Sequence, residues 1–166
     1  IENISHVLGM CPFHNLRRLA RHHKIKHQLA TLLERKGLQC HDEVQITAQD
    51  GTTRRIDIFA IDHANKKFYL IDPTIRYETN TDVGKIVEEE KARIYSPCLA
   101  QIPTLYPQCK EYTGEIIGLW FGGRGTISKQ VVTFFDRFDL DKNVLPDMTE
   151  SIIISSLRML HMHVYN

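Results

Sequence analysis

The stretch RIDIFAIDHANKKFYLID, residues 55–72, decides the fold that we expect for this chain. It contains two apolar segments rich in Ile, Phe, Tyr and Leu, joined by a short polar connection over Asp62–Lys67 that suits a hairpin. The pattern predicts one strand from about Arg55 to Ile61 and another from Lys67 to Asp72. The first carries apolar side chains on both faces, which indicates a strand covered on both sides of its sheet.

The hairpin brings two aspartates to opposite positions. If it is symmetric about Ala64 and Asn65, Asp57 pairs with Asp72, and their Cβ atoms lie roughly 4.5–5.5 Å apart on one face. Two carboxylates in apolar surroundings repel each other and lose hydration. A protonated aspartate, a bridging basic side chain or a divalent cation would relieve this. Mg²⁺ suits the pair because it prefers hard oxygen ligands, and it could assist attack on a phosphodiester.

Purely structural roles for the same two aspartates are equally open at this point. Asp57 could form an ion pair with Arg54 or Arg55, and Asp72 could cap the turn before Pro73. A different length of the hairpin loop would also separate the two carboxylates.

The remaining pattern predicts an α/β fold, in which helices flank a mixed central sheet. A break near Arg21 is expected because Leu16 and Leu19 fall on the side of the helical wheel opposite Ile25 and Leu29, which leaves Cys11–Ala20 as a separate short element. The expected elements are a helix at 21–36, a strand at 41–48 with a turn at 49–52, a helix at 81–97, a strand at 115–121, and helices at 129–138 and 149–164.

Two further side chains are candidates for chemistry beside the aspartates. Lys91 shares a helix side with Val87 and Ile94, so it faces the sheet or borders its buried edge, where it could stabilise developing negative charge. Its alternatives are a lysine head in solvent or an ion pair with a neighbouring glutamate. His22 lies at the N-terminal end of a buried stripe and could hold a water or a phosphate, although a plain core histidine is equally compatible.

Charge and composition narrow the class of protein. The net charge of the 166 residues is only +1, but residues 1–36 carry seven Lys/Arg against two Glu, a local balance of +5 that can attract a polyanion. No apolar run reaches the ~18 residues of a membrane span. Four dispersed cysteines indicate a reducing compartment rather than a disulfide framework. The start at Ile1 suggests a piece of a longer polypeptide.

Four short motifs, in this order and spacing, resemble a known family: Arg21-His22 opening a helix, Arg55-Ile56-Asp57 on a strand, Ile71-Asp72 on the next strand, and Lys91 four residues before Tyr95. Over about residues 6–125 the chain resembles the restriction-like endonuclease domain of site-specific non-LTR retrotransposons, which belongs to the PD-(D/E)XK superfamily. The resemblance implies a restriction-endonuclease-like core. It also implies a nuclear, Mg²⁺- or Mn²⁺-dependent DNA endonuclease, a phosphodiester hydrolase that nicks double-stranded target DNA. The reverse transcriptase region of the same polypeptide would then prime synthesis on the freed 3′ end.

The resemblance also implies roles for single residues. Asp57 and Asp72 match the two catalytic, metal-binding aspartates, and Lys91 matches a lysine supplied from the following helix, since Thr74 stands where the superfamily usually has lysine. His22 and Tyr95 match auxiliary catalytic positions.

Two residues depart from the superfamily pattern. Ile56 replaces the proline of the superfamily's name. Pro73, directly after Asp72, removes a ladder donor, so the strand is expected to end or bulge there.

The N-terminal residues resemble the end of a zinc knuckle. His6 and Cys11, spaced H-x4-C, match the second half of a CCHC motif whose first two cysteines would precede Ile1. Two ligands cannot complete the usual four-coordinate zinc site, so zinc is expected only with upstream ligands. We therefore expect residues 1–20 to be a remnant of the knuckle and a linker, and 21–166 to be the endonuclease domain.

Contacts to DNA phosphates are expected from basic side chains near these motifs, because such contacts position a protein without reading sequence. The candidates are Arg17, Arg18, Arg54 and Arg55. Two rival interpretations remain: a nuclease-like module that binds nucleic acid without cutting, which Pro73 and Thr74 favour, and an interaction module that docks onto its parent polypeptide.

Overall fold

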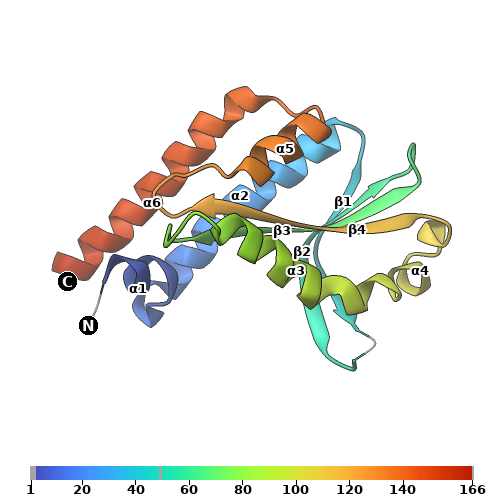
Figure 1. Cartoon of the computed structure of the whole chain (residues 1–166), viewed down its shortest axis with the longest axis horizontal. Coiled ribbons are helices and arrows are strands. Elements are labelled where there is room, and N and C mark those ends of the chain that lie inside the picture. The colour runs from blue at the N-terminus through green and yellow to red at the C-terminus, as the bar shows by residue number, and fades with distance from the viewer. Residues whose placement is uncertain (1–2, 49, 166) are drawn as a thin grey trace.

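The computed structural model describes residues 3–48 and 50–165, and it contains a four-stranded mixed sheet flanked by helices (Figure 1). The strands β1 to β4 lie in sequence order; the first three pair antiparallel and β4 pairs parallel to β3. Their bounds are Gln39–Thr47, Thr53–Asp62, Lys67–Arg76 and Thr113–Gly122. The predicted α/β class with a mixed sheet and flanking helices is confirmed.

Helices cover both faces of the sheet (Figure 1). The helices α2, α5 and α6 lie on one face, and α3 and α4 lie on the other. The α-helices are α1 (Ile4–Gly9), α2 (Asn15–Arg35), α3 (Val83–Leu99), α4 (Ile102–Leu105), α5 (Lys129–Arg137) and α6 (Leu145–Tyr165), with 3₁₀-helices η1 (Pro12–His14), η2 (Pro107–Cys109) and η3 (Lys142–Val144). Among the helices of the described residues, none is long and apolar enough to span a membrane.

Strand β2 serves two hydrophobic cores, as its sequence predicts. Ile58 and Ala60 pack into the core beneath α2, α5 and α6, while Phe59 and Ile61 pack into the core beneath α3. All four side chains are fully buried. The central strand is thus fixed by apolar burial on both sides, to which Ile58, Phe59 and Ile61 each contribute about 1.5–3 kcal/mol.

The predicted register of the hairpin is confirmed. Asp62 pairs with Lys67 and Ile58 pairs with Ile71, which is the symmetric arrangement about Ala64 and Asn65. The ladder between β2 and β3 starts at the Ile58–Ile71 pair, so Asp57 and Asp72 are the next residues beyond it. The turn expected at 49–52 includes Gln49, which lies outside the described residues.

Two predictions about the helices and one about β3 are wrong. There is no break near Arg21: α2 runs without interruption from Asn15, and Leu16 simply lies in solvent, 80% exposed. Residues Ile4–Gly9, for which no element was expected, form α1, whose first turn is capped by the side chain of Asn3. Strand β3 does not end at Pro73. Pro73 instead lies beyond the residues that pair with β2 and pairs with Leu119 of β4.

A chain of hydrogen bonds ties α2 to α6 and to the end of β4. The buried guanidinium of Arg21 donates to Ser156 Oγ at 2.7 Å and to the carbonyl oxygen of Leu8 at 3.0 Å. Ser156 Oγ in turn donates to the carbonyl oxygen of Gly123 at 2.6 Å. Because these groups are buried, each needs its partner. The chain therefore fixes the start of α2, next to His22, against the rest of the fold.

We predict that Ser156→Ala lowers the free energy of unfolding by about 1–3 kcal/mol, because it leaves Arg21 without one acceptor and Gly123 without its donor. Urea denaturation measures this change. Ser155→Ala is the control, since Ser155 is half-buried on the same helix and makes no side-chain hydrogen bond in the described part of the chain; it should change stability by less than about 0.5 kcal/mol. Equal effects of the two substitutions would contradict the role given to this chain.

Candidate active site

Four of the five predicted catalytic residues converge on one cavity of about 290 Å³. Asp57 comes from β2, Asp72 from β3, His22 from α2 and Lys91 from α3, so helices on both faces of the sheet contribute to the site, which lies where its two inner strands separate. The remaining lining residues are Gly9, Asn15, Arg18, Leu19, Arg21, Pro73, Thr74 and Ile75.

Asp72 is held by three neighbours. Lys91 Nζ lies 3.0 Å from Asp72 Oδ2, and the hydroxyl of Tyr95 donates to the same oxygen at 2.7 Å. The hydroxyl of Thr74 donates to Oδ1 at 3.0 Å. The side chain of Asp72 is only 7% exposed. Lys91 therefore pairs with the aspartate across the site, and neither extends into solvent nor pairs with a glutamate of its own helix.

Asp57 has a different environment. His22 Nε2 lies 3.0 Å from Asp57 Oδ2, although the contact does not have the angles of a hydrogen bond. The alternative pairing with the preceding arginines is not found: Arg54 contacts Asp50 and the carbonyl oxygen of Ile94, and Arg55 reaches Glu43 at 3.3 Å. Asp57 is thus buried with little to balance its charge.

The electrostatics follow from this burial. Loss of water, and then the negative charge of Asp72, raise the pKa of Asp57 to about 7. Burial lowers the pKa of His22 more than the charge of Asp72 raises it, so the imidazole is neutral at neutral pH. Burial, with Asp72 nearby, also raises the pKa of Tyr95, which keeps its hydroxyl a donor.

The backbone opens at Asp57. The ladder between β1 and β2 contains the pairs Asp42–Ile58 and Val44–Ile56, but within the described strands Glu43 and Asp57 do not pair. Glu43 has a φ of 52°, a left-handed conformation that is rare for a residue with a side chain and interrupts regular pairing. Its carboxylate lies 2.8 Å from the ammonium of buried Lys26, an ion pair that helps to hold this conformation.

Gly118 is a site residue that the sequence analysis missed. It pairs with Asp72 across β3 and β4, and a Cβ atom there would lie 3.1 Å from both the Cα of Glu88 and the Cγ of Lys91. The absence of a side chain allows α3 to approach β4 and brings Lys91 to Asp72. A glycine inside an otherwise strong strand is the available signal, since it often marks close approach of another backbone.

The donor set fits a hard divalent cation. Two carboxylates line the same cavity, and the raised pKa of Asp57 shows that the site favours added positive charge. Mg²⁺ and Mn²⁺ accept such oxygen ligands and complete their coordination with water or phosphate. The residues that could hold the ion are therefore Asp57 and Asp72.

The predicted phosphate-contacting arginines are distributed over different surfaces. Arg18 lines the cavity of the aspartates and donates to the carbonyl oxygen of Gly9. Arg17 lies beside another hollow, next to α6. Arg54 and Arg55 are engaged by carboxylates, as described above. Their contacts with DNA stay a prediction, and so does the division of the chain at residue 20.

The expected zinc pair lies apart from this cavity. The backbone N–H of Cys11 donates to the carbonyl oxygen of His6 at 2.9 Å. The side chain of Cys11, however, groups with those of His14 and His163.

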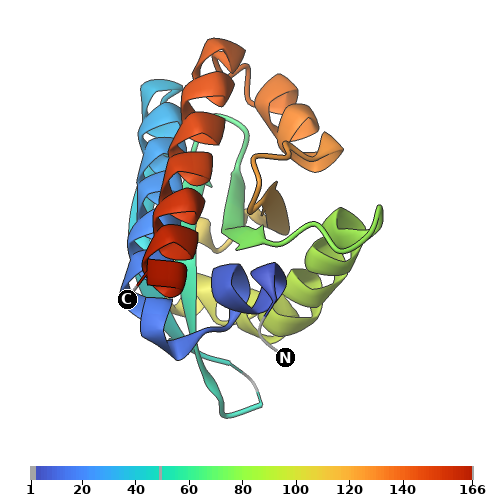
Figure 2. The same ribbon diagram turned by 90° about the vertical axis from the view of Figure 1, so that its left-hand side faces the viewer.

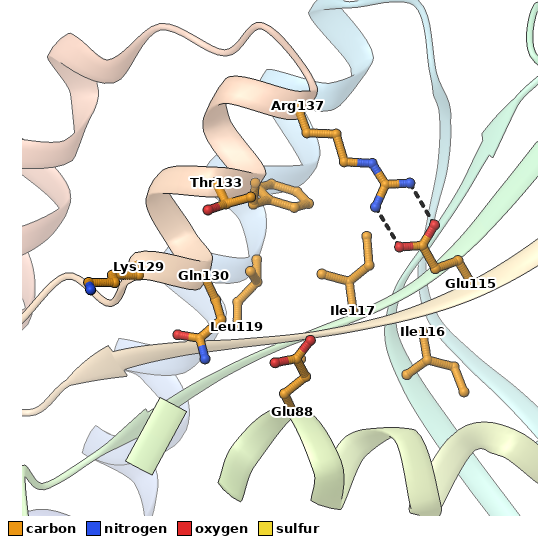
Figure 3. Close-up of a pocket in the computed structure, with 11 residues that line it drawn as sticks. Glu88, Glu115, Ile116, Ile117, Leu119, Lys129, Gln130, Thr133 and Arg137 are labelled. Atoms are coloured by element: carbon orange, nitrogen blue, oxygen red, sulfur yellow. Dashed lines mark hydrogen bonds and ion pairs between the residues drawn. The ribbon is translucent and has the colours of Figure 1, made fainter. Parts of the chain in front are cut away.

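A second cavity, of about 300 Å³, lies along β4 between α3 and α5 (Figure 3). Arg137 and Glu115 form a bidentate ion pair at its edge, with Arg137 Nη2 2.6 Å from Glu115 Oε2. Neither Asp57 nor Asp72 lines this cavity. Its charged groups balance each other, so we place the candidate active site at the aspartates.

Comparison with known proteins gives one informative similarity. The chain is 26% identical over 144 residues to a retrovirus-related Pol polyprotein from the type-1 retrotransposable element R2 of Popillia japonica. The chain is related to a retrotransposon protein. The match covers 85% of this chain but 28% of that polyprotein. No protein-family model matches the chain.

We predict that Gly118→Ala displaces α3 and lowers the free energy of unfolding by about 1–3 kcal/mol, because the added methyl group meets helix backbone. It should also disturb the contact between Lys91 and Asp72, which NMR of the lysine ammonium group detects. Gly114→Ala is the control: its methyl group meets Phe68 and Leu99 at the other end of β4. It should reduce stability while leaving the Lys91 signal in place. An unchanged Lys91 signal in Gly118→Ala would contradict this role of the glycine.

We predict that Asp57 makes the metal-free protein less stable as the pH rises. Its pKa is about 3.9 in an unfolded chain and about 7 in the folded one, so the folded state binds the proton more tightly. Its contribution is full below about pH 4 and is lost as the pH rises through about 7.

The side chain of Asn does not ionise, so Asp57→Asn does not lose stability as the pH rises through 7. At pH 8 this variant should have a higher free energy of unfolding than the wild type, by about 1–3 kcal/mol. Urea denaturation at pH 5 and pH 8 measures the difference. Asp62→Asn, an equal change of charge at the far end of β2, should not reproduce it. A wild type that gains stability relative to Asp57→Asn between these pH values would refute the assignment.

Proposed function

We propose that this chain is a divalent-metal-dependent DNA endonuclease domain that nicks one strand of a DNA duplex. The observation that supports it most is the meeting of Asp57, Asp72 and Lys91 at one cavity. Two carboxylates that can hold a divalent cation, with an ammonium beside them, suit hydrolysis of a phosphodiester, because the substrate is an anion that gains charge as it reacts. The motif resemblance and the relation to a retrotransposon polyprotein support the same assignment.

Asp57 and Asp72 are the residues that would hold Mg²⁺ or Mn²⁺. Such an ion, when bound, neutralises charge on the phosphodiester and lowers the pKa of a water. Thr74 and Tyr95 keep Asp72 in one orientation through their hydroxyl donors, at 3.0 and 2.7 Å. His22 lies beside Asp57 at the cavity, where its neutral ring could hold a water or a phosphate oxygen of the substrate.

Lys91 is the group that we assign to the transition state. Its ammonium lies in the cavity at the carboxylate of Asp72 and can donate to a phosphate oxygen as negative charge develops there. The oxygen of water attacks phosphorus, and the bond from phosphorus to the 3′ oxygen breaks. The leaving oxygen takes a proton, which gives a 3′ hydroxyl and a 5′ phosphate.

Basic groups at the cavity fit a polyanionic substrate. Arg18 lines the cavity and lies in the N-terminal segment whose charge is strongly positive, which also contains Arg17 on a neighbouring surface of the same helix. We propose that this side of α2 contacts phosphates of the duplex, with Arg54 and Arg55 as further contacts.

The biological setting that we propose follows the relative. It is named a Pol polyprotein, and this chain spans 28% of its length. We propose that the nick supplies a 3′ hydroxyl to a reverse transcriptase region of the same polypeptide, and that the protein works in the nucleus on double-stranded target DNA. This is the chemistry of target-primed reverse transcription.

The decisive experiment is nicking of supercoiled plasmid by the purified chain in the presence of Mg²⁺ or Mn²⁺. We expect Asp57→Asn to reduce the rate at least about hundredfold, since a lost metal ligand removes several kcal/mol of stabilisation of the transition state. Lys91→Met should lower the rate to a similar degree. Asp62→Asn, matched in charge and on the same strand, should retain the rate, and chelation of the cation should abolish it.

The same assay separates the main alternative, a nuclease-like module that binds nucleic acid without cutting. That alternative predicts salt-dependent DNA binding, no metal-dependent nicking, and no effect of Asp57→Asn. Nicking that persists unchanged in both Asp57→Asn and Lys91→Met would also refute the proposed active site.

A further inference from the structure

A second cluster of chemically reactive side chains lies where the two ends of the chain meet. Figure 2 shows η1 and the start of α2 beside the C-terminal end of α6. Cys11 precedes η1, His14 ends it, and His163 lies in the last turn of α6. One ligand atom from each of the three lies within 4.8 Å of the other two.

His14 makes this cluster more than a chance grouping. Its side chain is completely buried, and among the described residues neither of its ring nitrogens has a hydrogen-bond partner. A buried polar group without a partner costs about 1–3 kcal/mol, so native proteins rarely keep one without a reason. Burial lowers the pKa of His14, which keeps the ring neutral, the form that binds metals.

The distances suit a tetrahedral ion. Cys11 Sγ and His163 Nδ1 are 4.0 Å apart. With bonds of about 2.3 Å to sulfur and about 2.0–2.1 Å to nitrogen, tetrahedral ligand atoms are separated by roughly 3.5 Å. The rings of His14 and His163 are tilted, with centroids 5.5 Å apart. The Cys11–His163 pair would contract by about half an ångström to reach this separation, and no pair of ligand atoms would contract by more than about 1.3 Å.

We propose that Cys11, His14 and His163 bind Zn²⁺, with the fourth position taken by water or by a further ligand. A thiolate with two imidazoles is a donor set for zinc rather than for magnesium. The thiolate also offsets part of the ion's charge beside Arg17 and Arg18, which already contribute positive charge around His14.

This zinc site would join the two ends of the fold. Cys11 and His14 belong to the segment between α1 and α2, whereas His163 is 149 residues further on, at the end of α6. The buried hydrogen bond between Arg21 and Ser156 already connects α2 to α6 in the same part of the fold. Zinc would thus stabilise the start of α2, the helix that carries His22, without any part in the proposed nicking reaction.

The ligand set differs from the zinc knuckle expected from the H-x4-C spacing. His6 is not a member of the group that the described residues form; His14 and His163 are. The two arrangements share Cys11 and differ in every histidine. Substitution of single histidines therefore distinguishes them.

Titration of the reduced, metal-free chain with Co²⁺, and then with Zn²⁺, tests the site. We expect one equivalent of Co²⁺ to give thiolate-to-cobalt charge-transfer absorption and the intense visible bands of tetrahedral cobalt, which Zn²⁺ abolishes. Excess Mg²⁺ should not, because it does not compete for thiolate. Zinc at about a hundredfold over its Kd should raise Tm by roughly 5–10 °C.

The variants identify the ligands. His163→Ala should weaken Co²⁺ binding more than tenfold, and it is a mild change because His163 is only half-buried. His161→Ala, two residues away and exposed, should retain binding, as should His6→Ala and Asp57→Asn. Absence of charge-transfer absorption in the folded wild type would overturn the proposal. So would binding that is lost in His6→Ala and kept in His163→Ala. Both readouts are independent of nicking.

Discussion

The carboxylates of Asp57 and Asp72 repel each other at one cavity where each has lost most of its hydration, and the surrounding side chains compensate that repulsion unequally. The two acids lie just beyond the end of the ladder between β2 and β3, where the cavity opens between these two strands. Lys91, Tyr95 and Thr74 gather at Asp72, whereas Asp57 keeps a raised pKa. The fold holds an unfavourable pair because apolar burial along β2 and β3 fixes both strands on either side of it.

The sequence was sufficient for those features that depend on nearby residues. The hairpin over Asp62–Lys67 determines the register of β2 against β3 within a few residues, so opposite aspartates could be inferred without knowing the rest of the fold. The helix around Lys91 follows from the spacing of its own apolar residues. That spacing correctly predicted that Lys91 faces the sheet, where it contacts Asp72. Local periodicity also identified both faces of β2 as buried.

Features that depend on distant contacts could not be predicted in this way. The exposure of Leu16 shows that an apolar residue on the wrong side of a helix need not end it, because the hydrogen bonds of Arg21 to Leu8 and Ser156 already tie that part of α2 to α1 and α6. Pro73 is tolerated because β3 no longer pairs with β2 at that point, while its parallel pairing with β4 continues. The left-handed backbone of Glu43 is held by Lys26 from α2, and no pattern within β1 reveals that contact.

The two aspartates are consequently not equivalent, although they occupy matching positions in the hairpin. Asp72 already has an ammonium and two hydroxyl donors, so its charge is compensated before any ligand arrives. Asp57, with a pKa of about 7, holds its proton in a substantial part of the molecules at neutral pH. A cation that binds both must displace that proton, so its affinity rises with pH through this range. The acid that regulates loading of the proposed site is therefore Asp57, and the acid that positions Lys91 is Asp72.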